Sequence, residues 1–236
     1  MRIDVLGVGF DNLTLEQAVE KASRIKGGYV VTPNPEIVWL ARQNNDLKLA
    51  LQDASMVLPD GIGIIHGARI LSRPLKERVP GIEFASAYIE RLASENKKVF
   101  LLGAKPGVAE LAAEKLRKAY KGIEICGTAD GYFKDDAPII AAINEAKPDF
   151  LLVCFGAPKQ EIWMREHSGK VSAGLMAGLG GVLDVYAGVV ERAPEAWCRA
   201  GFEWLYRLLK QPSRIGRMFK LPLFMFAVIG QRIRGR

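Results

Sequence analysis

One stretch of the chain decides the fold, and it reads VFLLGAKPGVAELAAEKLRKAYKGIEI over residues 99–125. The continuous apolar run 99–102 predicts a buried strand, and a turn containing glycine and proline, 103–107, follows it. Residues 108–120 carry apolar side chains at helical spacing, and 123–125 predicts a second short strand. A strand, a helix and a strand in this order form a βαβ unit, so the two strands are expected to be parallel.

The same alternation continues through residues 1 to about 190. Helical patterns cover 137–147 and 14–25, and the second opens with the capping box Thr14-Leu15-Glu16-Gln17. Other short apolar runs predict strands at 5–7, 29–31, 56–58 and 150–153. We therefore expect an α/β fold over residues 1–194, with a Rossmann-like, largely parallel sheet and helices on both faces.

The composition is that of a globular cytoplasmic protein. Hydrophobic residues make up 49% of the 236 residues, which is enough for a sizeable core. Cys126, Cys154 and Cys198 stand far apart and include no C-x-x-C pair, so neither a disulfide framework nor a zinc site is indicated. Asp4 interrupts the apolar stretch that a secretory signal would need, so we expect no secretion.

The excess positive charge is concentrated near the C-terminus. The chain carries a net charge of +7, and residues 192–236 alone hold ten Lys or Arg against two Glu. This segment therefore has a balance of +8, and the residues before it carry −1. Such a segment usually meets phosphate, in nucleic acid, in lipid headgroups or in a substrate.

Residues 195–236 are expected to form a basic, amphipathic, helical appendage. As one helix from about Glu195, the segment places Trp197 and Trp204 on an apolar face and basic residues opposite. The apolar run 221–229 is far short of the roughly 20 residues that span a bilayer. Aromatic residues beside Arg and Lys favour a segment lying in the interface of a membrane. The alternative is a helix docked on the domain with a solvated basic face.

Glycines, prolines and polar residues gather directly after four of the expected strands. Because ligands bind at the carboxyl ends of strands in such sheets, these residues are expected to line one shared cleft. The four segments are 32–36, 59–63, 103–107 and 156–161. The last two suit contacts with a nucleotide, although ordinary turns between strand and helix look the same. Within the last one, Gln160 is a candidate for substrate binding.

Asp60 is the candidate catalytic base. It ends an apolar strand and precedes Gly61-Ile62-Gly63, which permits close backbone approach. A carboxylate here can take the proton of an acceptor hydroxyl, whereas the simpler interpretation is an N-cap for the next helix. Thr32 and Asn34 could bind sugar hydroxyls or a donor phosphate. Asn34 could equally be an N-cap, with Pro35 at the first helical position.

A departing diphosphate needs positive charge to stabilise it. Arg78 could neutralise a diphosphate, although on its own it would be taken for a surface arginine. Arg207, Arg214 and Arg217 of the basic segment are the other candidates. The chain holds no D-x-D triplet, and its two histidines lack metal-ligand partners at suitable spacing. We therefore expect no metal and no cofactor, and two histidines that are structural or exposed.

Taken together and in order, these segments resemble the WecG/TagA/CpsF family of bacterial glycosyltransferases, and they are most similar to its TagA branch. The resemblance covers essentially the whole chain, so it is far more specific than any single motif. The matching segments are 31–37 (VTPNPEI), 58–63 (LPDGIG), 78–81 (RVPG), 130–133 (DGYF), 156–161 (GAPKQE), 178–184 (GLGGVLD), 192–194 (RAP) and 203–214 (EWLYRLLKQPSR).

The resemblance implies an inverting, metal-independent enzyme whose catalytic base falls on Asp60, with Thr32 beside it. In the TagA branch, N-acetylmannosamine (ManNAc) moves from UDP-ManNAc to undecaprenyl-diphosphate-linked N-acetylglucosamine (GlcNAc), which primes wall teichoic acid synthesis. Other branches use other donors, such as a ManNAc uronate or a hexose. The implied partners are a UDP-sugar, a polyprenyl-diphosphate-linked acceptor and an anionic membrane, without nucleic acid. The implied location is cytoplasmic, attached peripherally to the inner face of the plasma membrane, and a homo-oligomer is left open.

Two other classes of function fit parts of the sequence. A nucleotide-dependent oxidoreductase would use the Rossmann-like sheet, but Gly7-Val8-Gly9 is followed by Asn12 where the fingerprint needs its third glycine. A non-catalytic module that binds membranes or nucleic acid would use the basic segment. That interpretation leaves the polar strand ends unexplained.

Overall fold

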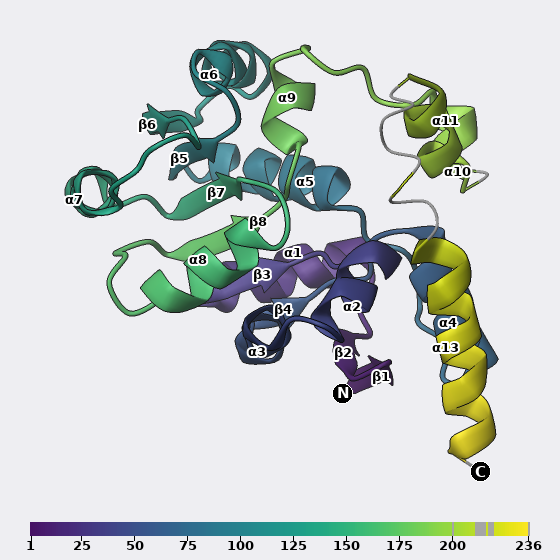
Figure 1. The fold of residues 1–236 in the computed structure, drawn as a ribbon. Coiled ribbons are helices and arrows are strands. Elements are labelled where there is room, and N and C mark those ends of the chain that lie inside the picture. The colour runs from purple at the N-terminus through teal and green to yellow at the C-terminus, as the bar shows by residue number, and fades with distance from the viewer. Residues whose placement is uncertain (200, 211–215, 217–219, 236) are drawn as a thin grey trace.

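The computed structural model describes residues 1–199, 201–210, 216 and 220–235. Its centre is a six-stranded sheet with the strand order β4-β3-β8-β7-β5-β6, and every neighbouring pair is parallel (Figure 1). The strands are β3 (Tyr29–Val31), β4 (Met56–Val57), β5 (Lys98–Gly103), β6 (Glu124–Ala129), β7 (Phe150–Cys154) and β8 (Leu175–Gly178). The expected parallel sheet is confirmed.

The expectation of a strand at residues 5–7 is wrong. Two strands, β1 (Arg2–Val5) and β2 (Val8–Asp11), form an antiparallel hairpin outside the main sheet. Leu6 and Gly7 are its turn residues, with φ of 56° and 86°. Positive φ at both central positions gives a turn whose twist matches that of the paired strands, so the apolar run bends back instead of continuing.

Helices connect the strands and confirm the helical patterns. Thr14 and Gln17 form the expected capping box, because each side chain accepts a hydrogen bond from the other residue's N–H, at 3.2 Å. The helices of the first 194 residues are α1 (Leu15–Arg24), α2 (Pro35–Ala41), α3 (Asn45–Asp53), α4 (Ile62–Ile70), α5 (Gly81–Ser94), α6 (Val108–Ala119), α7 (Ala137–Ala146), α8 (Lys159–His167) and α9 (Val182–Tyr186).

The sheet is buried on both faces. Side chains alternate between the faces of a strand, so Leu152 joins one apolar cluster and its neighbour Val153 joins the other. The first cluster includes residues of α1, α5, α6 and α9. The second includes residues of α2, α3, α4, α7 and α8 together with the β1–β2 hairpin. This arrangement explains why the strands read as continuous apolar runs.

The C-terminal segment does not begin with the one continuous helix that was expected from about Glu195. It contains α10 (Glu195–Arg199), α11 (Glu203–Lys210) and α13 (Lys220–Arg234). Between the first two, Gly201 has φ of 77°, a left-handed conformation that interrupts a helix. Figure 1 shows α10 and α11 together, apart from the strands, and α13 against α4. Within the described residues, no helix is long and apolar enough to cross a bilayer.

Helix α13 is docked on the domain. Phe224 and Val228 are fully buried in the second apolar cluster, and Gly67 of α4 leaves room for the Phe224 ring. Gln231 ties the helix to the hairpin: its Oε1 accepts from the N–H of Leu6 (2.9 Å), and its Nε2 donates to Asp4 (2.8 Å). One face of this helix is therefore docked, and contact of its other face with a membrane stays a prediction.

Candidate active site

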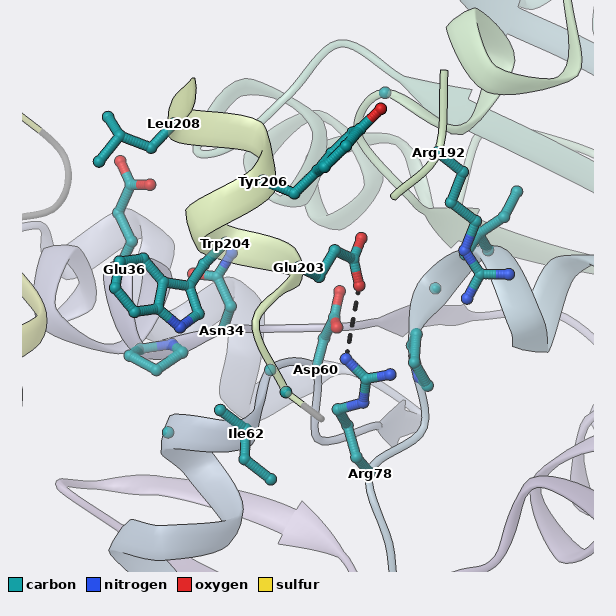
Figure 2. Close-up of a pocket in the computed structure, with 18 of the residues that line it drawn as sticks. Asn34, Glu36, Asp60, Ile62, Arg78, Arg192, Glu203, Trp204, Tyr206 and Leu208 are labelled. Carbon is teal, nitrogen blue, oxygen red and sulfur yellow. Dashed lines mark hydrogen bonds and ion pairs between the residues drawn. The ribbon is translucent and has the colours of Figure 1, made fainter. Parts of the chain in front are cut away.

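A cleft of about 700 Å³ opens at the carboxyl ends of β3, β4 and β8. It is lined by residues that follow these strands, by the start of α5, and by side chains of α11 and α13 (Figure 2). Ligands bind at this edge of parallel sheets, and small-molecule sites have volumes of roughly 300–1,000 Å³. Of the four segments expected to share a cleft, 32–36 and 59–63 contribute to the described lining, whereas 103–107 and 156–161 do not.

Asp60 lines this cleft at the end of the segment that follows β4. Its N–H donates to the carbonyl oxygen of Pro33 at 3.4 Å, which links the segments after β3 and β4. The N-cap of α4 is Gly61, with φ of 87° and no side-chain hydrogen bond, so the interpretation of Asp60 as N-cap is wrong. A Cβ added to Gly63 would come within 2.7 Å of the Pro35 ring. These two glycines let α4 begin directly against α2.

Of the two polar residues after β3, Asn34 lines the cleft and Thr32 is buried. Asn34 is the N-cap of α2: its Oδ1 accepts from the N–H of Ile37 (3.0 Å), and Pro35 takes the first turn. Asn34 also lines the cleft, so the confirmed capping role leaves its substrate contact as a prediction. Thr32 is 8% exposed and lies behind Gly81, where an added Cβ would come within 3.1 Å of its hydroxyl oxygen.

Arg78 lies inside the cleft, so its interpretation as a surface arginine is wrong. Its Nη1 pairs with the carboxylate of Glu203 at 3.4 Å, and its Nη2 donates to the carbonyl oxygen of Cys198, also at 3.4 Å. Glu83 lies 4.0 Å from Nη2 and forms a second ion pair with Arg192. Arg78 therefore joins the first 194 residues to α10 and α11.

Helix α11 forms one wall of the cleft. Figure 2 shows the carboxyl groups of Glu203 and Asp60 and the guanidinium of Arg78 gathered in its centre. The residues of α11 that line the cleft are Glu203, Trp204, Tyr206, Leu208 and Lys210. Arg207 belongs to α11, but its side chain lies outside the described part of the chain, as do Arg214 and Arg217 entirely. Their contact with a diphosphate stays a prediction.

Gln160 lies behind the cleft and is 3% exposed. Its Oε1 accepts from the N–H groups of Gly156 (3.1 Å) and Gly180 (2.9 Å), and its Nε2 donates to Glu161 (2.9 Å). It thus ties the loop after β7 to the loop after β8, which continues into the cleft at Gly181. Burial raises the pKa of Glu161 to about 7. A direct contact of Gln160 with substrate stays a prediction.

The two histidines are placed as expected. His66 is exposed and lines the cleft one turn beyond Ile62 on α4. His167 bonds to Asp136 at 3.0 Å and stacks on Trp163, with ring centroids 4.8 Å apart. Among the described residues, no group of three or more His, Cys, Asp or Glu is placed to hold a metal ion.

Several residues that line the cleft were not identified as site residues from the sequence. Glu203 and Trp204 stand in the segment considered as a membrane helix, and their distance from Asp60 in the chain hid their place beside it. Asp184 and Arg192 lie within segments that carry the family resemblance, which is the one signal that pointed to them. No local pattern gave either residue a role.

Comparison with known proteins agrees with this geometry. The model of the glycosyl transferase WecG/TagA/CpsF family matches residues 3–236. A protein of Bacillus spizizenii named N-acetylglucosaminyldiphosphoundecaprenol N-acetyl-beta-D-mannosaminyltransferase is 36% identical over 204 residues, covering 86% of this chain and 79% of its own length. A protein of the same name from Staphylococcus aureus strain MW2 is 35% identical over 233 residues, covering 96% and 92%. This chain therefore belongs to the WecG/TagA/CpsF family of glycosyl transferases.

Proposed function

We propose that this enzyme transfers ManNAc from UDP-ManNAc to GlcNAc linked to undecaprenyl diphosphate, which makes the lipid-linked disaccharide that primes wall teichoic acid synthesis. One observation carries the proposal: relatives aligned over nearly the whole chain are named for this sugar and this acceptor. The position of Asp60 inside the cleft supports it, because the transfer needs a base.

Asp60 is the proposed base. Its carboxylate takes the proton of an acceptor hydroxyl while that oxygen forms a bond to the anomeric carbon of the donor sugar. The bond from this carbon to the diphosphate oxygen breaks, and its electron pair leaves with UDP. Attack from the side opposite to the leaving group inverts the configuration at the anomeric carbon.

Arg78 and Arg192 are the proposed partners of the departing diphosphate. Both line the cleft, and a guanidinium can bind two phosphate oxygens at once. Positive charge placed where negative charge develops stabilises the transition state. Because Glu203 pairs with Arg78, a bound diphosphate would take over or share this guanidinium. Arg207, Arg214 and Arg217 are proposed to add charge from the C-terminal segment.

A peripheral position on the inner, anionic face of the plasma membrane completes the proposal. Opposite the buried side of α13, four apolar side chains are 43% to 72% exposed: Leu223, Phe226, Ile229 and Ile233. Arg232 and Arg234 follow in the last turn. Such a face suits the membrane interface and would bring the cleft to an acceptor that stays in the bilayer. Residues 1–194 would then supply Asp60, and residues 195–236 the wall of the cleft and the membrane contact.

A donor panel tests the proposal. The full-length enzyme is assayed with UDP-ManNAc, UDP-GlcNAc, UDP-glucose and a UDP-ManNAc uronate on a lipid-diphosphate-GlcNAc acceptor, and the disaccharide is detected by mass spectrometry. UDP-ManNAc is expected to exceed every other donor in kcat/KM by at least roughly tenfold. Preference for another donor would assign the enzyme to a different surface polysaccharide. The absence of product with all four donors would contradict the proposal.

A further inference from the structure

The cleft has two chemically different halves on either side of Asp60. Figure 2 shows Arg78 and Arg192 on one side, and Trp204, Asn34 and Glu36 on the other. Ile62 and Leu208 lie on this second side as well, and α13, which packs against α2 and α4, adds Leu221, Phe224 and Met225 to the lining of the cleft. The side with two arginines suits a diphosphate, whereas the other side offers an aromatic ring among polar groups.

The stereochemistry of the proposed transfer assigns one substrate to each half. The following steps rest on the proposed function. Inversion requires the acceptor hydroxyl and the leaving diphosphate to stand on opposite sides of the anomeric carbon. If the diphosphate takes the half with Arg78 and Arg192, the acceptor sugar must take the half with Trp204. This half also borders α13, whose exposed apolar face is the proposed membrane contact.

Trp204 is held in place and yet presents its ring to the cleft. Its side chain is 40% exposed, although the neighbouring Glu203 side chain is 13% exposed and paired with Arg78. Three residues before Trp204, the backbone of Gly201 lies close to α4, because an added Cβ would lie 3.2 Å from Ile62. A tryptophan ring that is carried by a fixed backbone and exposed to a cleft loses little conformational entropy on binding and offers a flat apolar face.

The residues around Trp204 suit a sugar rather than a lipid chain or a phosphate. Figure 2 shows Asn34 and Glu36 on the same side as Trp204, and His66 of α4, one turn beyond Ile62, also lines the cleft. Amide, carboxylate and imidazole groups all bond hydroxyl groups, and the C–H face of a pyranose packs on an aromatic ring. One aromatic face with convergent polar groups is the composition expected of a carbohydrate subsite.

We propose that Trp204 is the stacking face of the acceptor-sugar subsite, with Asn34, Glu36 and His66 at its edge. Trp204 thereby presents the acceptor hydroxyl to Asp60, and the C-terminal segment contributes to recognition of the acceptor as well as to the membrane contact.

The test compares Trp204→Leu with Phe202→Leu. Phe202 is a matched control, because it is also an aromatic residue of the C-terminal segment, is 50% exposed, and lies outside the lining of the cleft. The acceptor is a water-soluble GlcNAc-diphosphate with a short alkyl chain, so membrane binding has no influence. Trp204→Leu is expected to raise KM for this acceptor about tenfold, the scale of one lost aromatic contact, and to change KM for UDP-ManNAc less than twofold. Phe202→Leu is expected to change neither constant.

The other outcomes are equally decisive. Trp204→Phe keeps a ring face and is expected to restore most of the acceptor KM, with melting temperatures of all three variants confirming the fold. An unchanged acceptor KM in Trp204→Leu, or a loss seen only with membrane-embedded acceptor, would overturn the subsite. A rise in donor KM instead would move Trp204 to the donor half. Lack of turnover by the unmodified enzyme would refute the proposed function rather than this subsite.

Discussion

Gly63 controls how closely the first turn of α4 approaches α2 beside Asp60. A Cβ at this position would come within 2.7 Å of the Pro35 ring, which cannot rotate away. Gly63→Ala is therefore expected to push α4 and the preceding Asp60 outward. Overpacking of this kind costs about 1–3 kcal/mol of unfolding free energy, and a shift of about 1 Å near the chemistry lowers turnover by up to about 100-fold.

The matched control is Gly169→Ala. A Cβ at Gly169 meets no atom of the described chain within 4 Å. This variant is expected to keep both the melting temperature and the turnover. Equal turnover in Gly63→Ala and Gly169→Ala would show that the approach of α4 to α2 does not position Asp60.

Glu161 makes stability depend on pH. Burial raises its pKa from 4.5 to about 7, and one oxygen, Oε2, has no hydrogen-bond partner among the described residues. Between these two pH values the unfolded chain binds fewer protons at this residue than the folded chain does. The free energy of unfolding therefore falls as pH rises from about 4.5 to 7, and the loss is complete above the folded pKa.

Glu161→Gln tests this dependence, because glutamine has nearly the same shape, can still accept the bond from Gln160, and does not ionise. Urea unfolding of both proteins between pH 5 and pH 8 is the measurement. The unmodified protein is expected to lose stability relative to the variant up to about pH 7 and to hold a constant difference above it. A difference that does not vary with pH would mean that Glu161 is ionised in the folded protein throughout.

At the residue scale, the sequence predicted the position of Asp60 and the cap at Asn34, because both depend on local patterns. It could not predict that the side-chain amide of Gln160 forms hydrogen bonds with two glycine N–H groups and with Glu161, since those bonds join separate loops. It also could not predict the pairing of Arg78 with Glu203, which are 125 positions apart. Such contacts depend on how distant segments meet.

At the element scale, α13 has two faces with different roles. Phe224 is fully buried against α4, and Phe226, two residues later, is 72% exposed. Phe224→Ala is expected to leave a cavity and to lower the free energy of unfolding by about 3–5 kcal/mol. Phe226→Ala is expected to change stability by less than about 0.5 kcal/mol.

Liposome sedimentation separates the faces further. Phe226→Ala is expected to bind vesicles of anionic lipid more weakly than the unmodified enzyme, while its turnover of a water-soluble acceptor is unchanged. Vesicle binding at the original strength, confirmed in a variant that also replaces Leu223 and Ile229, would contradict the proposed membrane face of α13.

The elements show where sequence patterns were sufficient. The expected helices at 14–25, 108–120 and 137–147 appear within a residue or two of their predicted ends, because capping residues and periodicity are local. β8 was not predicted: its four residues, Leu175–Gly178, include no β-branched or aromatic side chain, yet it lies between β3 and β7. The position of β8 in the sheet is determined by its pairing with both neighbouring strands.

At the scale of the whole molecule, the fold brings the C-terminal segment back over the strand ends. Continuous apolar runs predicted the sheet with helices on both faces, because strands buried on both sides leave that trace in a sequence. The sequence of α11 has no comparable pattern that marks it as a wall of the cleft. Its amphipathic pattern fits a membrane surface, a docked helix or the wall of a cleft equally well, and only the assembled fold distinguishes them.

The central claim is that Asp60 acts as the base within this assembled cleft, and Asp60→Asn tests it most directly. Asparagine keeps the shape of the side chain but cannot accept the proton. Turnover of UDP-ManNAc and the lipid-diphosphate-GlcNAc acceptor is measured at saturating concentrations of both, together with the melting temperature. We predict a fall in kcat of roughly 10²- to 10⁴-fold with a nearly unchanged melting temperature. A variant that folds normally and keeps kcat within a few-fold of the unmodified enzyme would contradict the account.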